Sequence, residues 1–153
     1  MEEKYTFSSL ISCILNIENQ AAQFYREIAG RLENRELSIF LLSLSESYMR
    51  NAELIDKRRR ETVVEMALEP ISGLNISSYI ARINSIISSG EMRDIDKAIE
   101  LSRIIEELYF KASSKIASIS PDTSELLSRL SRRKSSERRR LEEFKTYSST
   151  TLQ

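Results

Sequence analysis

The sequence predicts an all-α fold, a four-helix bundle made of two antiparallel helical hairpins that are joined by a long crossover. The composition supports it, because 41% hydrophobic and 30% charged residues with only three glycines and two prolines favour helices over strands. Apolar residues also recur three and four positions apart, the period of an amphipathic helix. A chain of 153 residues fits one domain without a disulfide or metal. We expect this domain over residues 1–147 and a polar, frayed tail over 148–153.

The first hairpin is predicted from two long apolar stripes. Over residues 6–32 the stripe consists of Leu10, Ile14, Ile17, Ala21, Phe24 and Ile28. Gly30 and the polar residues after it end this helix, and Asn34 is suited to cap the next one, which we expect from 35 to at least 60. Because the connection is short, the two helices should be antiparallel neighbours.

The second hairpin follows a region in which the periodicity is lost. Residues 61–90 contain one of the prolines and two of the glycines, so we expect a crossover there with a short helix over 76–88. A third long helix is predicted over 92–119. Ser and Asp flank Pro121, a combination that favours a helix start, so the fourth helix is predicted over 122–147.

An internal repeat relates the two hairpins. When NIENQAAQFYREIAG is aligned with ELSRIIEELYFKASS so that Tyr25 matches Tyr109, an isoleucine and a phenylalanine of the first stretch fall on leucines of the second. The two halves therefore look like duplicated hairpins.

The stretches IENQAAQFYREIA and SLSESYMRNAELID resemble the rubrerythrin family of ferritin-like di-iron proteins. That family has a Glu-x6-Tyr first helix, followed by a helix with Glu-x-x-His-Ala-Glu-Leu. The resemblance extends as a pattern over about residues 7–145 and implies a ferritin-like four-helix bundle. In such bundles a dinuclear metal site takes one Glu from each of two helices and a Glu-x-x-His pair from each of the other two. Residues three apart share a helix face, carboxylates bridge the cations and imidazole completes the coordination.

Transferred to this sequence, the six ligand positions fall on Glu18, Tyr48, Asn51, Ser102, Lys134 and Glu137. Only Glu18 matches in type, with Tyr25 seven residues later as in the family, while Glu137 keeps a carboxylate where imidazole is expected. The sequence contains no histidine. We therefore expect a degenerate di-iron site with no cofactor and no catalytic residue, since two carboxylates without imidazole make a poor di-iron site.

These positions lie on the inward stripes, so we predict that they meet near the middle of the bundle as a polar core. In this hypothesis Lys134 takes over the positive charge of the lost metals and pairs with Glu18 and Glu137. The hydrogen-bonding members of the polar core are Tyr25, Tyr48, Asn51, Ser102 and Tyr109. In the alternative, the polar run SRRKSSERRR lies on an exposed stretch of helix, with Lys134 and Glu137 in solvent.

Three function classes follow from these features. The favoured one is a non-catalytic bundle that self-associates, with a dimer expected, or binds an unidentified protein. The second is a diverged metalloprotein that handles iron or peroxide with iron or manganese bound by Glu18, Glu137 and their neighbours. The third is a weak nucleic-acid binder that uses the arginine-rich runs at 57–60 and 138–140. Both runs lie towards helix C-termini, where cations stabilise the helix dipole without any ligand.

The remaining features restrict location and chemistry. Lys plus Arg and Asp plus Glu both number 23, so no overall charge attracts nucleic acid or an anionic membrane. The single Cys13 is expected to be a buried thiol, which suits a reducing compartment. Neither a signal sequence nor a membrane span is apparent, so we expect a cytoplasmic protein. Without histidine, Ser and Cys lack their usual catalytic base.

Overall fold

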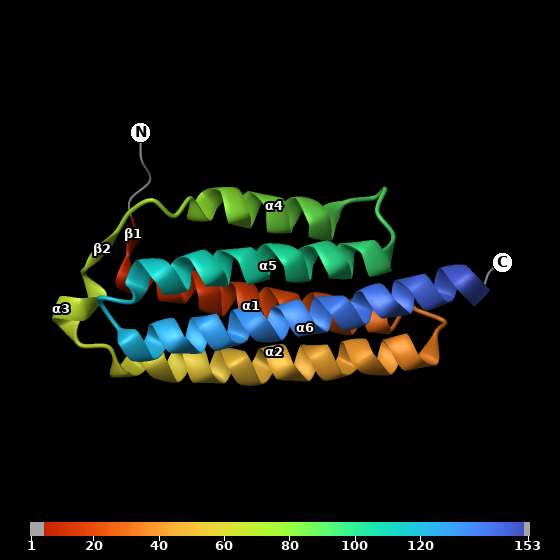
Figure 1. Cartoon of the computed structure of the whole chain (residues 1–153), viewed down its shortest axis with the longest axis horizontal. Coiled ribbons are helices and arrows are strands. Elements are labelled where there is room, and N and C mark those ends of the chain that lie inside the picture. The colour runs from red at the N-terminus through yellow and green to blue at the C-terminus, as the bar shows by residue number, and fades with distance from the viewer. Residues whose placement is uncertain (1–4, 152–153) are drawn as a thin grey trace.

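The computed structural model describes residues 5–151, and its architecture is a bundle of four long helices (Figure 1). The long helices are α1 (Phe7–Ala29), α2 (Arg35–Glu61), α5 (Asp94–Ile116) and α6 (Pro121–Thr151). The remaining elements are the helices α3 (Val64–Ala67) and α4 (Ile76–Ser88) and the strands β1 (Tyr5–Thr6) and β2 (Pro70–Ile71). The predicted fold class, an all-α bundle, is confirmed.

The bundle consists of two closely packed hairpins, α1 with α2 and α5 with α6. The crossover between them contains α3, β2 and α4, and α4 packs along α5 on the side of the bundle away from α2 (Figure 1). Since α1 and α5 run in opposite directions, residues near the start of one helix lie opposite residues near the end of the other. This relation places Tyr25 beside Ser102 and Tyr109 beside Glu18.

Side chains cap three of the long helices at their starts. The Thr6 hydroxyl accepts the Ser9 N–H at 3.1 Å, while the Ser9 hydroxyl accepts the Thr6 N–H at 2.9 Å. The Asn34 carbonyl oxygen accepts the Leu37 N–H at 3.1 Å, which confirms the predicted cap of α2. The Ser120 hydroxyl accepts the Thr123 N–H at 3.3 Å at the start of α6. Each cap satisfies a backbone donor that the helix itself leaves unpaired.

The structure differs from the sequence prediction at short elements and at helix ends, since α1 ends at Ala29 rather than near 32 and α5 covers Asp94–Ile116 rather than about 92–119. The strands β1 and β2 pair antiparallel, and the Phe7 N–H donates to the Glu69 carbonyl at 2.8 Å. Two-residue strands and the four-residue α3 are too short to show a periodicity in the sequence. Helix α6 continues to Thr151, past the predicted end at 147, because neither Gly nor Pro follows Pro121. Residues 152 and 153 of the predicted tail lie outside the described residues.

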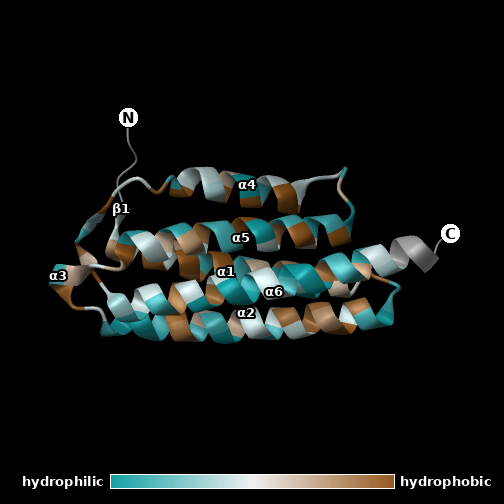
Figure 2. Ribbon diagram, in the orientation of Figure 1, coloured by the Kyte–Doolittle hydropathy of each residue, from teal (hydrophilic) through white to brown (hydrophobic). Residues whose placement is uncertain are grey.

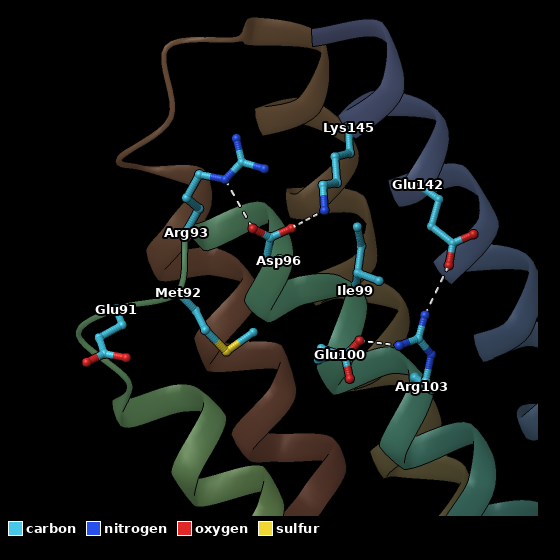
Figure 3. Close-up of a pocket in the computed structure, with 9 residues that line it drawn as sticks. All are labelled: Glu91, Met92, Arg93, Asp96, Ile99, Glu100, Arg103, Glu142 and Lys145. Atoms are coloured by element: carbon cyan, nitrogen blue, oxygen red, sulfur yellow. Dashed lines mark hydrogen bonds and ion pairs between the residues drawn. The ribbon is translucent and has the colours of Figure 1, made fainter. Parts of the chain in front are cut away.

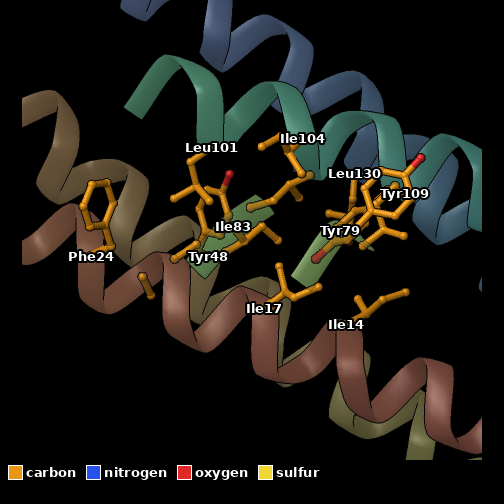
Figure 4. Packing of buried hydrophobic residues seen from close by; sticks show 14 of the residues in the cluster. Ile14, Ile17, Phe24, Tyr48, Tyr79, Ile83, Leu101, Ile104, Tyr109 and Leu130 are labelled. Atoms are coloured by element: carbon orange, nitrogen blue, oxygen red, sulfur yellow. The ribbon is translucent and has the colours of Figure 1, made fainter. Parts of the chain in front are cut away.

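The hydrophobic core lies between the helices along their inward stripes. Hydrophobic residues accordingly recur at intervals along the helices (Figure 2). In the close view of this core, Ile14 and Ile17 of α1 point toward α5, and Ile14 lies opposite Tyr109 (Figure 4). Cys13 is only partly buried at the edge of the core, so the expectation of a fully buried thiol is wrong. Among the described residues, no helix is long and apolar enough to cross a membrane.

Candidate functional site

A buried ion pair lies in the middle of the bundle. The Lys134 Nζ atom of α6 lies 3.0 Å from Oε1 and 3.3 Å from Oε2 of Glu18 on α1. Both side chains are 0% exposed, so neither charge is screened by solvent. Taking two charges out of water costs several kcal/mol each, and their mutual attraction and hydrogen bonds must offset that cost. The exposed-helix alternative for Lys134 is therefore wrong.

Two tyrosines connect this pair to the repeat in the sequence. The Tyr109 hydroxyl on α5 donates to Glu18 Oε1 at 2.8 Å, and the Tyr25 hydroxyl on α1 lies 2.9 Å from the Ser102 hydroxyl on α5. Each tyrosine thus contacts the residue seven positions before the other tyrosine. This reciprocal pairing follows from two copies of one seven-residue spacing on antiparallel helices.

Aromatic rings enclose the Lys134 ammonium. Its Nζ atom lies 3.5 Å from the ring centroid of Tyr48 and 5.8 Å from that of Tyr109. The rings of Tyr48 and Tyr25 are in contact, with centroids 5.2 Å apart. A desolvated cation over a ring face gains about 2 kcal/mol. Lys134 is therefore stabilised by rings in addition to the Glu18 carboxylate.

The tyrosine hydroxyls of this site stay neutral. Burial is the largest cause that raises the pKa of Tyr25, Tyr48 and Tyr109, and the negative charge of Glu18 raises it further in each case. A neutral phenol can donate a hydrogen bond to a carboxylate, whereas a phenolate cannot. The site therefore contains one ammonium, the Glu18 carboxylate and neutral hydroxyl donors.

Glu137 does not pair with Lys134, so that part of the polar-core hypothesis is wrong. No Lys134–Glu137 ion pair occurs among the described residues. Although the two residues are three apart on α6, the Lys134 ammonium contacts the Glu18 carboxylate of α1 instead. Burial raises the pKa of Glu137 to about 7, with Glu18 also raising it and the positive charges of Lys134 and Arg133 lowering it.

Asn51 lies at the edge of the site, between α2 and α6. Its Oδ1 atom accepts a hydrogen bond from Arg133 Nη1 at 3.3 Å. Arg133 was not among the residues predicted for this site, although it precedes Glu137 by four residues, a spacing at which side chains on a helix are neighbours. That spacing is the signal that could have identified it.

The site residues do not fit the dinuclear metal centre that the fold family implies. Among the described residues, no group of three or more His, Cys, Asp or Glu side chains is placed to hold a metal ion. The donor chemistry also disagrees, because the Lys134 ammonium already occupies one side of the Glu18 carboxylate. Serine, tyrosine and asparagine at three other ligand positions bring no negative charge of their own, and Glu137 is the one further carboxylate of the set.

An open surface pocket lies elsewhere, near the start of α5 and the later part of α6 (Figure 3). Asp96 is paired with Arg93 at 3.1 Å and with Lys145 at 2.7 Å, and Arg103 is paired with Glu100 and Glu142. The cations that line this pocket are thus already neutralised by neighbouring carboxylates. The pocket does not offer a free charge to an anionic ligand.

The arginine-rich runs also form ion pairs with the protein itself. Arg59 and Arg60 both contact Asp56, at 2.7 Å and 3.3 Å. Arg138 contacts Glu106 at 3.0 Å, and Arg140 contacts Glu143 at 2.9 Å. These contacts reduce the positive charge that either run can offer to a phosphate backbone.

Comparison with known proteins gives a structural match but no sequence match. No protein-family model matches the chain, and a search of curated proteins returned no match either. Among solved structures, a Thermotoga maritima protein assigned provisionally as a ferritin-like diiron-carboxylate protein superposes with a TM-score of 0.75. The match covers 97% of this chain and 99% of that one at 16% sequence identity. The chain therefore has a ferritin-like helical-bundle fold.

Proposed function

We propose that this protein is a rubrerythrin-like bundle in which a buried Lys134–Glu18 pair has replaced the di-metal centre, and that it works without catalysis. One observation carries the proposal: the Lys134 Nζ atom lies 3.0 Å from a Glu18 carboxylate that is itself 0% exposed. Glu18 is the position that the family resemblance assigns to the first metal ligand. The ammonium thus provides the positive charge that a metal would otherwise supply to this carboxylate.

Electrostatics argue against a metal beside this ammonium. A divalent cation about 4 Å from a unit positive charge is repelled by about 8 kcal/mol at an effective dielectric constant of roughly 20. Metal binding to Glu18 would therefore require Lys134 to lose its proton or leave the site. Accordingly, we propose that the protein uses no cofactor and has no catalytic residue.

The proposed role is self-association, with a dimer as the expected state, or binding of a protein partner. Support comes from exposed apolar side chains on α2. Ile39, Leu42 and Met49 are 57%, 42% and 45% exposed, and their spacing places them on one helical stripe. Apolar side chains that gather on one exposed stripe are typical of protein contact surfaces.

The oligomeric state of the purified protein tests this role. We expect light scattering coupled to size exclusion to give a mass above that of one chain, and Leu42→Glu to shift the mass to one chain. Arg129→Glu, an exposed change on α6, is the matched control and should leave the mass unchanged. A parent protein that stays monomeric at high concentration would restrict the proposal to binding of a different protein.

The alternative of a diverged metalloprotein rests on the carboxylates of Glu18 and Glu137. An aerobic Fe(II)-oxidation assay separates the two functions, because a ferroxidase produces Fe(III) faster than buffer alone. We expect the parent and Glu18→Ala to match the buffer rate. Oxidation by the parent that disappears in Glu18→Ala, but not in the exposed control Glu125→Ala, would favour the metalloprotein.

A further inference from the structure

The two halves of the polar centre differ in how completely their hydrogen bonds are made. Between α1 and α5, Tyr109 donates to Glu18, and Tyr25 contacts both the Ser102 hydroxyl at 2.9 Å and the Ala98 carbonyl at 3.4 Å. Between α2 and α6, three buried polar atoms have no hydrogen-bond partner among the described residues. They are Asn51 Nδ2, Glu137 Oε1 and Tyr48 Oη, and the Tyr48 hydroxyl interacts with the Tyr25 hydroxyl outside ordinary hydrogen-bond geometry.

The three residues that carry these atoms lie where α2 and α6 pack together, a region named here the α2–α6 seam. Tyr48 and Asn51 are three residues apart on α2, so they share a helix face, and both are at most 1% exposed. Glu137 is on α6, and Arg133, one turn before it, donates to Asn51 Oδ1 across the seam at 3.3 Å. The three atoms therefore come from both helices of this seam, two from α2 and one from α6.

Their chemistry matches a single water molecule. The Asn51 amide nitrogen can only donate, the Tyr48 hydroxyl can donate, and the Glu137 carboxylate oxygen can accept. A water molecule has two lone pairs for the first two groups and a hydrogen for the third. Buried waters in proteins typically make about three such bonds to groups that are otherwise unsatisfied.

We propose that Tyr48, Asn51 and Glu137 form a binding site for one ordered water molecule in the seam between α2 and α6. A cation there would be repelled by Lys134, and an anion by the Glu137 carboxylate, so a small neutral hydrogen-bonding molecule is the occupant that fits. Glu137 is only partly buried and Arg133 is exposed, which gives this seam a route to solvent. The polar groups between α1 and α5, by contrast, hydrogen-bond to one another.

A crystal structure of the full chain at about 1.5 Å tests the site directly. We expect one well-ordered density peak at about 2.7–3.2 Å from all three atoms. A direct hydrogen bond between Asn51 Nδ2 and Glu137, with no peak in the seam, would overturn the proposal. This outcome is independent of the Fe(II)-oxidation result, so the two proposals fail separately.

Paired tyrosine variants give a second test in solution. Tyr109→Phe removes a hydroxyl with a known partner and should lower the urea midpoint. If Tyr48 donates to a bound water, Tyr48→Phe should lower the midpoint in the same direction, because the water loses one of its three bonds. An unchanged or higher midpoint for Tyr48→Phe, beside a lower one for Tyr109→Phe, would mean that the Tyr48 hydroxyl has no partner and would contradict the proposal.

Discussion

Replacing Lys134 by Met should destabilise the protein strongly. Methionine retains the length of the side chain but removes the charge, so Glu18 stays buried with the Tyr109 hydrogen bond and no countercharge. Breaking a buried pair in this way costs about 3 to 5 kcal/mol. Since each kcal/mol shifts Tm by roughly 2 to 4 °C in a domain of this size, the expected loss is roughly 6 to 20 °C.

Urea unfolding followed by circular dichroism measures this effect. The matched control is Lys57→Met on α2, where the lysine is 69% exposed and its contact with Glu61 should contribute less than about 0.5 kcal/mol. A double variant, Glu18→Gln with Lys134→Met, should be more stable than the sum of the single changes predicts, because it leaves no buried unpaired charge. If Lys134→Met unfolds at the same urea concentration as the parent, the buried-pair reasoning is refuted.

Three further outcomes follow from the same site. Tyr109→Phe removes the only hydrogen bond that this hydroxyl makes to Glu18 and should cost about 1.5 to 3 kcal/mol in urea unfolding, while a cost near zero would contradict that bond's role. The pKa of Glu137 rises from 4.5 to about 7 in the folded state, so the protonated group stabilises the folded protein. Its contribution to the free energy of unfolding is fully present below pH 4.5 and is lost as pH rises through about 7, a decrease of about 3 kcal/mol. Glu137→Gln should remove this part of the pH dependence, measured as the parent-minus-variant difference across the window, and equal pH profiles would disprove the assignment. Ser102→Ala should destabilise by about 1 kcal/mol, because Tyr25 loses a buried hydrogen-bond partner, and a more stable variant would count against the pairing.

Much of the fold was predictable because long amphipathic helices leave a regular trace in the sequence. The short helix predicted over 76–88 corresponds to α4, Ile76–Ser88, and Asn34 caps α2 as expected. The pairing of β1 with β2 was not predictable, because backbone hydrogen bonds hold two residues on each side and no side-chain pattern encodes them. The end of α6 was missed because its polar final residues match a tail as well as an exposed helix.

The site was predictable to the extent that it depends on helical spacing. The inward position of Lys134 and its contact with Glu18 follow from stripes that each helix shows by itself. The contact of Lys134 with the Tyr48 ring depends on how far apart α2 and α6 lie, and that distance is a property of the packed bundle. Whether Lys134 pairs with Glu18, with Glu137 or with both depends on side-chain conformations in the packed bundle, which helical periodicity does not resolve.

The metal content of the purified protein tests the central claim most directly, namely that the Lys134 ammonium stands where the fold family holds metal. Protein produced in medium supplemented with iron and manganese would be analysed by mass spectrometry of the elements, with Glu18→Ala in parallel. The account predicts far less than one metal ion per chain in both samples. Near-stoichiometric iron or manganese in the parent that is lost in Glu18→Ala would contradict it.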